Sequence, residues 1–323
     1  MNSLDVSPLN DNLTFGARVS GLTEALTKDA AVCARLNEVF EDRGVIVFED
    51  VEPTLKMQMA ISNVFGPPKE FPVKAALVDT GDGTASSVLQ IKREPGASDN
   101  YIVEIDGKPY CNWRPFHFDH AYTNELNRGG VLRAVVLAPA GGMTGFADGI
   151  QLYNDFSPDL RTRIERLNVI YTMDALLCHM RFGMPPNVRE IKSESPEVIQ
   201  QIVEVTKSMP RAIHPAVWTR KSGEKVLHVS GQHSVGIEGH EDPEGDALLE
   251  AVCQEIIDKA RPYFHSWKPT DMVLWDNWRM LHAVSGINPE HSRTVHRTTI
   301  KGDYGLGYYE HEAGLRGPRE SSK

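Results

Sequence analysis

The chain has few cysteines and no long apolar segment. Its four cysteines are scattered through 323 residues without a CxxC pair, at Cys33, Cys111, Cys178 and Cys253. This pattern argues against a disulfide framework and against a cysteine zinc site, and it favours a reducing, cytoplasmic environment. No run of about 18 apolar residues occurs, so no membrane-spanning helix is expected. The polar segment 1–12 lacks a basic-then-apolar leader, and no secretory signal is expected.

Basic residues are also in the minority. The chain has 34 Lys and Arg against 44 Asp and Glu, which gives a formal net charge of -10. A general nucleic-acid-binding surface needs a basic footprint, so that class of partner is excluded. Internal repeats, low-complexity tracts and Pro/Gly/Ser-rich linkers are absent as well. We therefore expect residues 1–323 to form one domain with a large core.

Hydrophobic periodicity predicts several helices and many short strands. Helical spacing of apolar residues marks segments 27–43, about 54–65, from Ser157, from Ser195, and about 245–260. Strands are expected at 45–48, 88–92, 131–138, 226–229, 272–275 and 294–300, with 72–112 otherwise irregular. Thr27, Ser157 and Ser195 are the expected N-caps. Many short strands with a few helices favour a β-sandwich or barrel over alternating βαβ units.

Three polar residues form the most informative group in the sequence. His117 and Asp119 are two apart, so in a strand both side chains would reach one ion. His282 follows the distant Trp275-Asp276-Asn277 turn. Two imidazoles and one carboxylate are the ligand set of non-haem Fe(II) sites with open positions. The alternatives are a chance or salt-bridged His117/Asp119 pair and a hydrogen-bonded core histidine at position 282.

Two arginines lie downstream on a strand with alternating character. Arg293 and Arg297 are four residues apart and share a face with Val295. Such a pair could line the solvent side of a sheet. It could equally line a pocket, where two buried guanidiniums would need anionic partners to offset their desolvation. An anionic co-substrate would supply these partners, because the planar guanidinium suits a carboxylate.

Several segments share their order and spacing with one known family. They are Phe15-Gly16-Ala17, Gly44–Phe48, His117-x-Asp119-x-x-Tyr122, Pro139 with Gly141–Thr144, Ala147-Asp148, His214-Pro215, Gly223–Leu227, Trp275-Asp276-Asn277, His282, Arg293 and His296–Ile300. Taken together, they resemble the family of taurine dioxygenase and chlorophenoxyacetate dioxygenase over most of the chain.

The resemblance implies a fold and an activity. The fold would be mainly β with flanking helices, a double-stranded β-helix (jelly roll, cupin-like). The protein would be a dioxygenase, an oxidoreductase that uses Fe(II), 2-oxoglutarate and O2. It would oxidise, most often by hydroxylation, a small organic substrate of anionic or aromatic character, with release of succinate and CO2.

The resemblance also implies roles for particular residues. His117, Asp119 and His282 would ligate iron. Arg293 would bind the distal carboxylate of 2-oxoglutarate, helped by the Thr144 hydroxyl. Arg297 would lie close to the metal and contact the other end of 2-oxoglutarate or an anionic group of the substrate.

The surroundings of the metal motif depart from the family pattern. Phe116 stands where Trp is usual, and Trp278 where Arg is common. Substrate contacts are expected from Lys69, Arg114, His120 and Tyr122. For the two cations the alternative is a solvated surface position, and for His120 a passive packed role.

Two other functions remain open at this stage. A zinc hydrolase could use the same three ligands. A non-catalytic ligand-binding protein could share the scaffold. The identity of the substrate, the choice between hydroxylation and desaturation or bond cleavage, and association into a homo-oligomer are not specified by the sequence.

Overall fold

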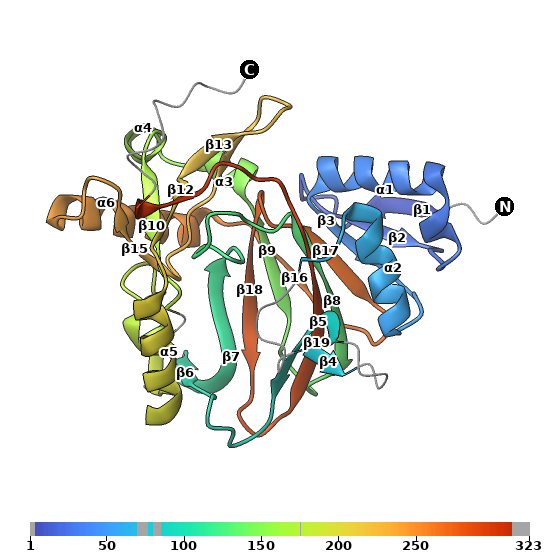
Figure 1. The fold of residues 1–323 in the computed structure, drawn as a ribbon, viewed down its shortest axis with the longest axis horizontal. Coiled ribbons are helices and arrows are strands. Elements are labelled where there is room, and N and C mark those ends of the chain that lie inside the picture. Colours follow the sequence, from blue (N-terminus) through green and yellow to red (C-terminus); the bar gives the residue numbers. More distant parts are fainter. Residues whose placement is uncertain (1–3, 70–76, 80–84, 175, 312–323) are drawn as a thin grey trace.

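Two sheets dominate the computed structural model, which describes residues 4–69, 77–79, 85–174 and 176–311 (Figure 1). The larger sheet has eight strands in the spatial order β1 (Asp5–Pro8), β2 (Ala17–Ser20), β3 (Val45–Phe48), β17 (Met272–Asp276), β8 (Gly129–Val136), β19 (Arg293–Ile300), β5 (Ala85–Arg93) and β4 (Leu77–Asp79). The second sheet has six, in the order β11 (Val188–Lys192), β6 (Ile102–Ile105), β7 (Lys108–His117), β18 (Met280–Ile287), β9 (Thr144–Asp148) and β16 (Tyr263–His265).

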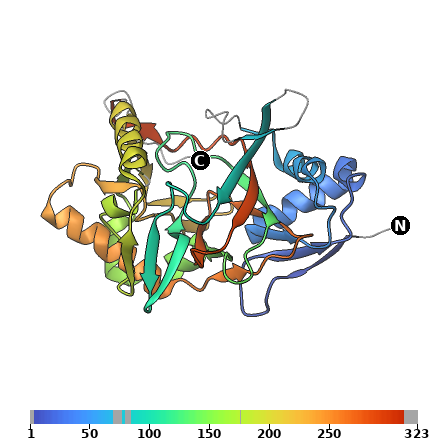
Figure 2. The same cartoon turned by 90° about the horizontal axis from the view of Figure 1, so that it is seen from below.

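The two sheets contribute to one interior. Phe146 of β9 and Met280 of β18 pack in the same buried cluster as Trp275 of β17 and Val295 of β19. The pairing of β7 with β18 and of β8 with β19 is antiparallel, and these pairs lie at the centre of their sheets (Figures 1 and 2). This arrangement is the jelly-roll fold expected from the resemblance, and it leaves a space between the sheets for a ligand.

Helices cover the outer surfaces. Near the N-terminus, α1 (Ala30–Arg43) and α2 (Leu55–Phe65) pack apolar residues against the eight-stranded sheet (Figure 1). On the opposite side lie the remaining helices, α3 (Gly149–Asp155), α4 (Pro158–Ile164), α5 (Pro196–Ser208) and α6 (Pro243–Lys259). Among the helices that the structure describes, none combines the length and the apolar character needed to cross a membrane.

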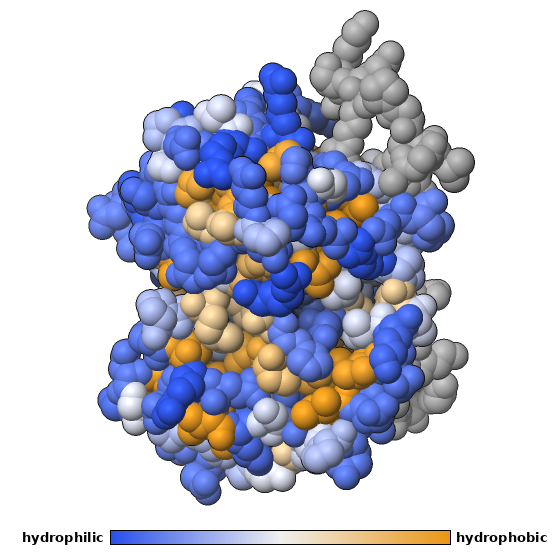
Figure 3. All heavy atoms as spheres, turned by 90° about the vertical axis from the view of Figure 1, so that its left-hand side faces the viewer, coloured by the Kyte–Doolittle hydropathy of each residue, from blue (hydrophilic) through white to orange (hydrophobic). Residues whose placement is uncertain are grey.

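Two small sheets complete the side that carries α5 and α6. One has four strands in the order β15 (Ser234–Ile237), β10 (Asn168–Tyr171), β12 (Ala212–Pro215) and β20 (Tyr308–Tyr309), and the other pairs β13 (Val217–Thr219) with β14 (Lys225–Leu227). Beneath them, α6 buries Leu249 and Val252 in a large cluster that also holds Phe118. On this face the apolar residues form separate patches among hydrophilic ones (Figure 3).

The helix starts partly match the sequence predictions. Ser195 caps α5 by accepting from the backbone N–H of the first turn at 3.4 Å, as predicted. The prediction for Thr27 is wrong, because α1 begins after Asp29, whose carboxylate accepts from two backbone N–H groups. Ser157 precedes α4 as predicted but makes no capping bond; its hydroxyl donates to Glu255 at 2.8 Å.

The prediction that 72–112 is irregular apart from one strand is wrong. Its described part contains β4, β5, β6 and the first half of β7. The apolar alternation of β7 is interrupted by Pro109 and by Asn112, whose backbone has a left-handed φ of 56°. Pairing with β6 and with the distant β18, rather than an alternating sequence pattern, stabilises this strand.

Candidate active site

Three potential metal ligands come together where β7 ends. His117 is the last residue of β7, Asp119 follows it, and His282 on β18 is the direct antiparallel partner of His117. Their ligand atoms all lie within 4.8 Å of one another. The two imidazole ring centres are 4.1 Å apart, and His282 Nε2 is 3.8 Å from an Asp119 carboxylate oxygen. Asp119 is buried and pairs with Arg297, so the alternative of a salt-bridged His117/Asp119 pair on the surface is wrong.

The protonation states of these residues suit a metal ion. Burial lowers the pKa of His117 to about 3 and that of His282 to about 4, so both imidazoles are neutral near pH 7. His117 Nδ1 donates to the Pro115 carbonyl at 2.9 Å, which leaves its Nε2 lone pair for a metal. Burial alone would raise the pKa of Asp119, but Arg297 holds it below its ordinary value. Two neutral nitrogens and one carboxylate fit a divalent transition metal.

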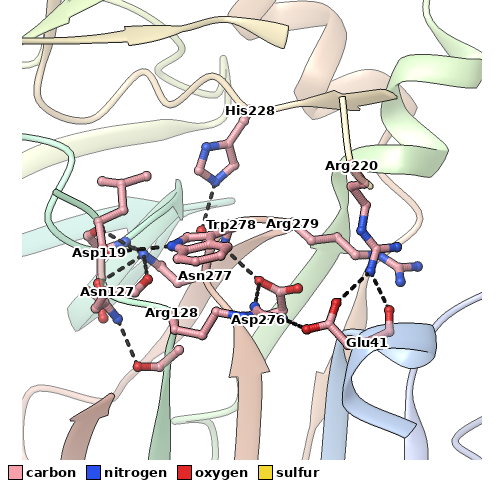
Figure 4. Close-up of polar contacts among 12 residues, drawn as sticks. Glu41, Asp119, Asn127, Arg128, Arg220, His228, Asp276, Asn277, Trp278 and Arg279 are labelled. Carbon is pink, nitrogen blue, oxygen red and sulfur yellow. Dashed lines mark hydrogen bonds and ion pairs between the residues drawn. The ribbon is translucent and has the colours of Figure 1, made fainter. Parts of the chain in front are cut away.

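The backbone of Asp119 is held by a buried amide (Figure 4). Asn277 Oδ1 accepts from the Asp119 N–H at 2.8 Å, and its Nδ2 donates to the Asp119 carbonyl at 3.0 Å. The same Nδ2 donates to Asn127 Oδ1 at 3.0 Å. His228 Nε2 donates to the Asn277 carbonyl at 2.9 Å. Asn277 thus links the turn after β17 to the residue that offers the carboxylate ligand.

The turn between β17 and β18 is fixed by ion pairs (Figure 4). Asp276 accepts from the Trp278 N–H at 2.9 Å and pairs with Arg128. Arg279 forms a buried ion pair with Asp148 at 2.8 Å, joining the start of β18 to the end of β9. The Trp278 indole lies against the Arg128 guanidinium and therefore belongs to the same support. These contacts set the position of His282.

Two arginines from β19 approach the same space from the opposite sheet. Arg297 donates to both carboxylate oxygens of Asp119, at 2.8 and 2.7 Å. Arg293 is only 5% exposed and has no hydrogen bond or ion pair within the described part of the chain. Burial lowers its pKa to about 10, so it stays charged near pH 7. Gly142, with φ of 67°, packs on it, and a Cβ there would lie 3.0 Å from Arg293 Nε.

A cavity of about 320 Å³ connects these groups. Its lining includes most of the site residues expected from the sequence, namely Arg114, His117, Asp119, His120, Tyr122, Thr144, His282, Arg293 and Arg297. Lys69 does not line it; its ammonium donates to the Glu125 carbonyl at 2.9 Å, and burial lowers its pKa.

Other lining residues escaped the sequence analysis. Asn112, Met173, Gln232 and His233 also face the cavity. They come from β7 and from loops beside the four-stranded sheet, and they belong to no motif. Two of them, Asn112 and His233, have a left-handed backbone, which is visible only in the structure.

Comparisons with known proteins agree on one group. A family model described as taurine catabolism dioxygenase TauD, TfdA family matches residues 5–299. The (S)-phenoxypropionate/alpha-ketoglutarate-dioxygenase of Sphingobium herbicidovorans is 28% identical, over 93% of this chain and 96% of that protein. The alpha-ketoglutarate-dependent 2,4-dichlorophenoxyacetate dioxygenase of Cupriavidus pinatubonensis is 24% identical, over 93% and 99%.

Solved structures support the fold. The crystal structure of AAD-2 in complex with Mn(II) and N-oxalylglycine matches with a TM-score of 0.67 and 21% identity, over 94% of this chain and 99% of that one. A taurine dioxygenase from Burkholderia xenovorans matches with a TM-score of 0.64 and 22% identity, over 93% and 90%.

Proposed function

This chain belongs to the taurine catabolism dioxygenase TauD, TfdA family, and we propose that it oxidises a small anionic organic substrate at the cavity between its two sheets. It is an oxidoreductase, a 2-oxoglutarate-dependent dioxygenase that uses Fe(II) and O2. Fe(II), 2-oxoglutarate and O2 together supply an oxidant for a substrate C–H bond, while 2-oxoglutarate becomes succinate and CO2. In our proposal His117, Asp119 and His282 hold the iron.

The observation that carries the proposal is the meeting of two incomplete sites in one cavity. The first is the three-ligand group, whose atoms lie within 4.8 Å of one another. The second is Arg293, a buried cation with no counter-ion within the described residues. An unpaired buried charge is strongly unfavourable, so this residue calls for an anionic ligand. The distal carboxylate of 2-oxoglutarate would fill that need.

Thr144 and Arg297 would complete the binding of 2-oxoglutarate or substrate. Thr144 is buried and lines the cavity, with its hydroxyl accepting from Trp267 Nε1 at 3.2 Å. This contact leaves the hydroxyl proton free to donate to a carboxylate. Arg297 Nε is buried without a partner among the described residues, so it can donate to an anionic group while Nη1 stays on Asp119.

Relatives suggest the kind of substrate. Two of them carry the names of phenoxypropionate and dichlorophenoxyacetate dioxygenases, and a third is named a sulfate ester dioxygenase. All three names describe anionic compounds. The cavity of this chain is bordered by four arginines, Arg93, Arg114, Arg293 and Arg297, which favours an anion here as well.

The alternatives receive no such support. A zinc hydrolase is not favoured by the family model or by the relatives above, which are dioxygenases. We also propose a cytoplasmic location and no nucleic-acid partner. The four free cysteines and the net charge of -10 support these two points.

The test is turnover with defined components. Purified protein is given Fe(II), 2-oxoglutarate and O2, with phenoxypropionate, 2,4-dichlorophenoxyacetate or an alkyl sulfate ester, and succinate is measured. We expect iron- and oxygen-dependent succinate that at least one of these anions stimulates. Hydrolysis of an ester that needs Zn²⁺ but no O2 would contradict the proposal.

A further inference from the structure

Part of the cavity wall has no role in holding iron or 2-oxoglutarate. It consists of His120, Tyr122, Met173, Gln232 and His233, which we call the polar recess. His120 and Tyr122 follow the metal-binding segment directly. The other three come from the loops after β10 and before β15. The polar recess is therefore assembled from three separate parts of the chain, and it faces the same space as the ligands.

Two residues of the polar recess have an unusual backbone. His120 and His233 have left-handed φ values of 61° and 69°. Residues with a Cβ rarely adopt this conformation, and such strain concentrates at ligand-binding positions. Both imidazoles flank Tyr122, with ring centres 6.0 and 5.3 Å from it. The strained backbone thus directs two polar rings toward one aromatic wall of the cavity.

The polar recess also contains hydrogen-bonding atoms for which the described residues provide no partner. Gln232 Oε1, His120 Nδ1 and His233 Nδ1 are buried and have no partner within the described part of the chain. Buried polar atoms are nearly always hydrogen-bonded, because an unmade bond in the interior is costly. A bound molecule that offers complementary groups would remove this cost.

The hydrogen bonding of His233 defines what that molecule must offer. The imidazole donates to the backbone of Asp174. Since Nδ1 has no partner, the donating atom is the other ring nitrogen. In a neutral imidazole the second nitrogen is an acceptor, so Nδ1 of His233 accepts. Gln232 Oε1 is an acceptor by its chemistry. Two neighbouring residues that line the cavity therefore carry buried acceptors without a partner among the described residues.

We propose that Gln232 and His233 recognise a hydrogen-bond donor, a hydroxyl or N–H group, on a substrate whose ring packs against Tyr122 and Met173. This proposal rests on the proposed function, since it describes the other end of the same substrate. It assigns the chain to hydroxylated or amino-substituted aromatic acids rather than to aromatic acids without a donor. The acid group would face the arginines and the donor group the polar recess.

Matched ligands test the proposal directly. Phenoxyacetate is compared with its 3-hydroxy and 4-hydroxy derivatives, which differ only by the donor. Binding to the enzyme loaded with Mn(II) and 2-oxoglutarate is measured by calorimetry, so that no turnover is needed. We expect at least one hydroxylated acid to bind wild-type protein about tenfold more tightly than phenoxyacetate, because it satisfies buried acceptors.

Variants then assign the preference to the two residues. In His233→Phe and in Gln232→Leu, the ratio of the dissociation constants of phenoxyacetate and the hydroxylated acid should fall close to one. The affinity for 2-oxoglutarate should not change. Gln232→Leu still tests the proposal if a substitution at the strained position 233 impairs folding. His240→Phe and Gln201→Leu make the same chemical changes at exposed positions and should keep the preference.

The outcomes separate this proposal from the proposed function. Equal or absent binding of the hydroxylated acids by wild-type protein would overturn it, and so would a preference that survives both variants. Succinate formation from 2-oxoglutarate, measured with the anions named above, reports on the proposed function alone. Turnover with no preference for substrates that carry a donor would still support the dioxygenase assignment. It would show that the polar recess does not recognise a donor group.

Discussion

Arg293 carries a positive charge where the described residues provide no counter-ion. The residue is 5% exposed, lines the cavity and packs against Gly142. Folding buries this charge at a cost that no ion pair among the described residues offsets. A charge buried in this way does not stabilise the fold, and our proposal gives it a ligand instead. The same reasoning separates it from Arg297, which already pairs with Asp119.

Replacing Arg293 should therefore affect the co-substrate and not the fold. Arg293→Ala is expected to raise the KM for 2-oxoglutarate by about 100-fold, since loss of one partner of a buried charge pair costs about 3 kcal/mol. Without 2-oxoglutarate, its thermal midpoint should equal or exceed that of wild type. Arg189→Ala, at an exposed arginine of β11, is the control. An unchanged KM would remove Arg293 from the carboxylate site.

Asn277 acts on the metal through the backbone of Asp119 rather than by contact. It is fully buried and holds both the N–H and the carbonyl of that residue. Asn277→Ala should weaken Mn(II) or Co(II) binding by about 10- to 100-fold, as loss of supporting contacts does at other metal sites. Titration of the metal-free protein measures this. Asn277→Ala with wild-type metal affinity and an intact fold would show that Asp119 needs no such support.

Elements were predictable where their signals are local. The capping serine before α5 and the apolar stripe of α6 lie within one segment, and both helices are found. β7 and β18 are different, because their alternation is broken and the pairing that joins them links segments far apart in the sequence. His117 and His282 face each other only because these two strands pair. The candidate ligand residues could be identified from the sequence, but the strand register that brings them together could not.

The loop after β14 places a buried histidine beneath the site. His228 stacks on Phe118 with ring centres 3.9 Å apart and donates to the Asn277 carbonyl. Burial, with a smaller effect of His214, lowers the pKa of His228 from 6.5 to about 3. Below pH 6.5 the unfolded chain therefore binds more protons at this residue than the folded chain. The free energy of unfolding must fall as pH is lowered toward the folded value.

This effect can be measured by denaturation of the metal-free protein. Between its folded and unfolded pKa values, one titrating group changes the free energy of unfolding by up to about 1.4 kcal/mol per pH unit. Between pH 7 and pH 5 wild type should lose about 2 kcal/mol more than His228→Gln, whose side chain does not titrate. Urea unfolding curves at the two pH values provide the comparison. Equal losses in the two proteins would mean that His228 is not buried as a neutral group.

At the scale of the molecule, the site is a product of two sheets. The ligand group lies on the six-stranded sheet, and Arg293 and Arg297 lie on the eight-stranded one. Spacing in the sequence predicted which residues share a strand face, and β19 bears this out because Arg293, Val295 and Arg297 all line the cavity. It could not predict which loops close the cavity. His233 was for that reason unassigned, and Lys69 was expected at a wall it does not reach.

The convergence of three side chains on one ion is tested most directly by anaerobic Fe(II) titration. Wild-type protein is compared with His117→Ala, Asp119→Ala and His282→Ala, each checked for folding by circular dichroism. We predict one tightly bound Fe(II) per wild-type chain, and loss of that binding in every variant while the fold remains. A folded His282→Ala protein that binds Fe(II) as tightly as wild type would contradict the assignment of the metal centre.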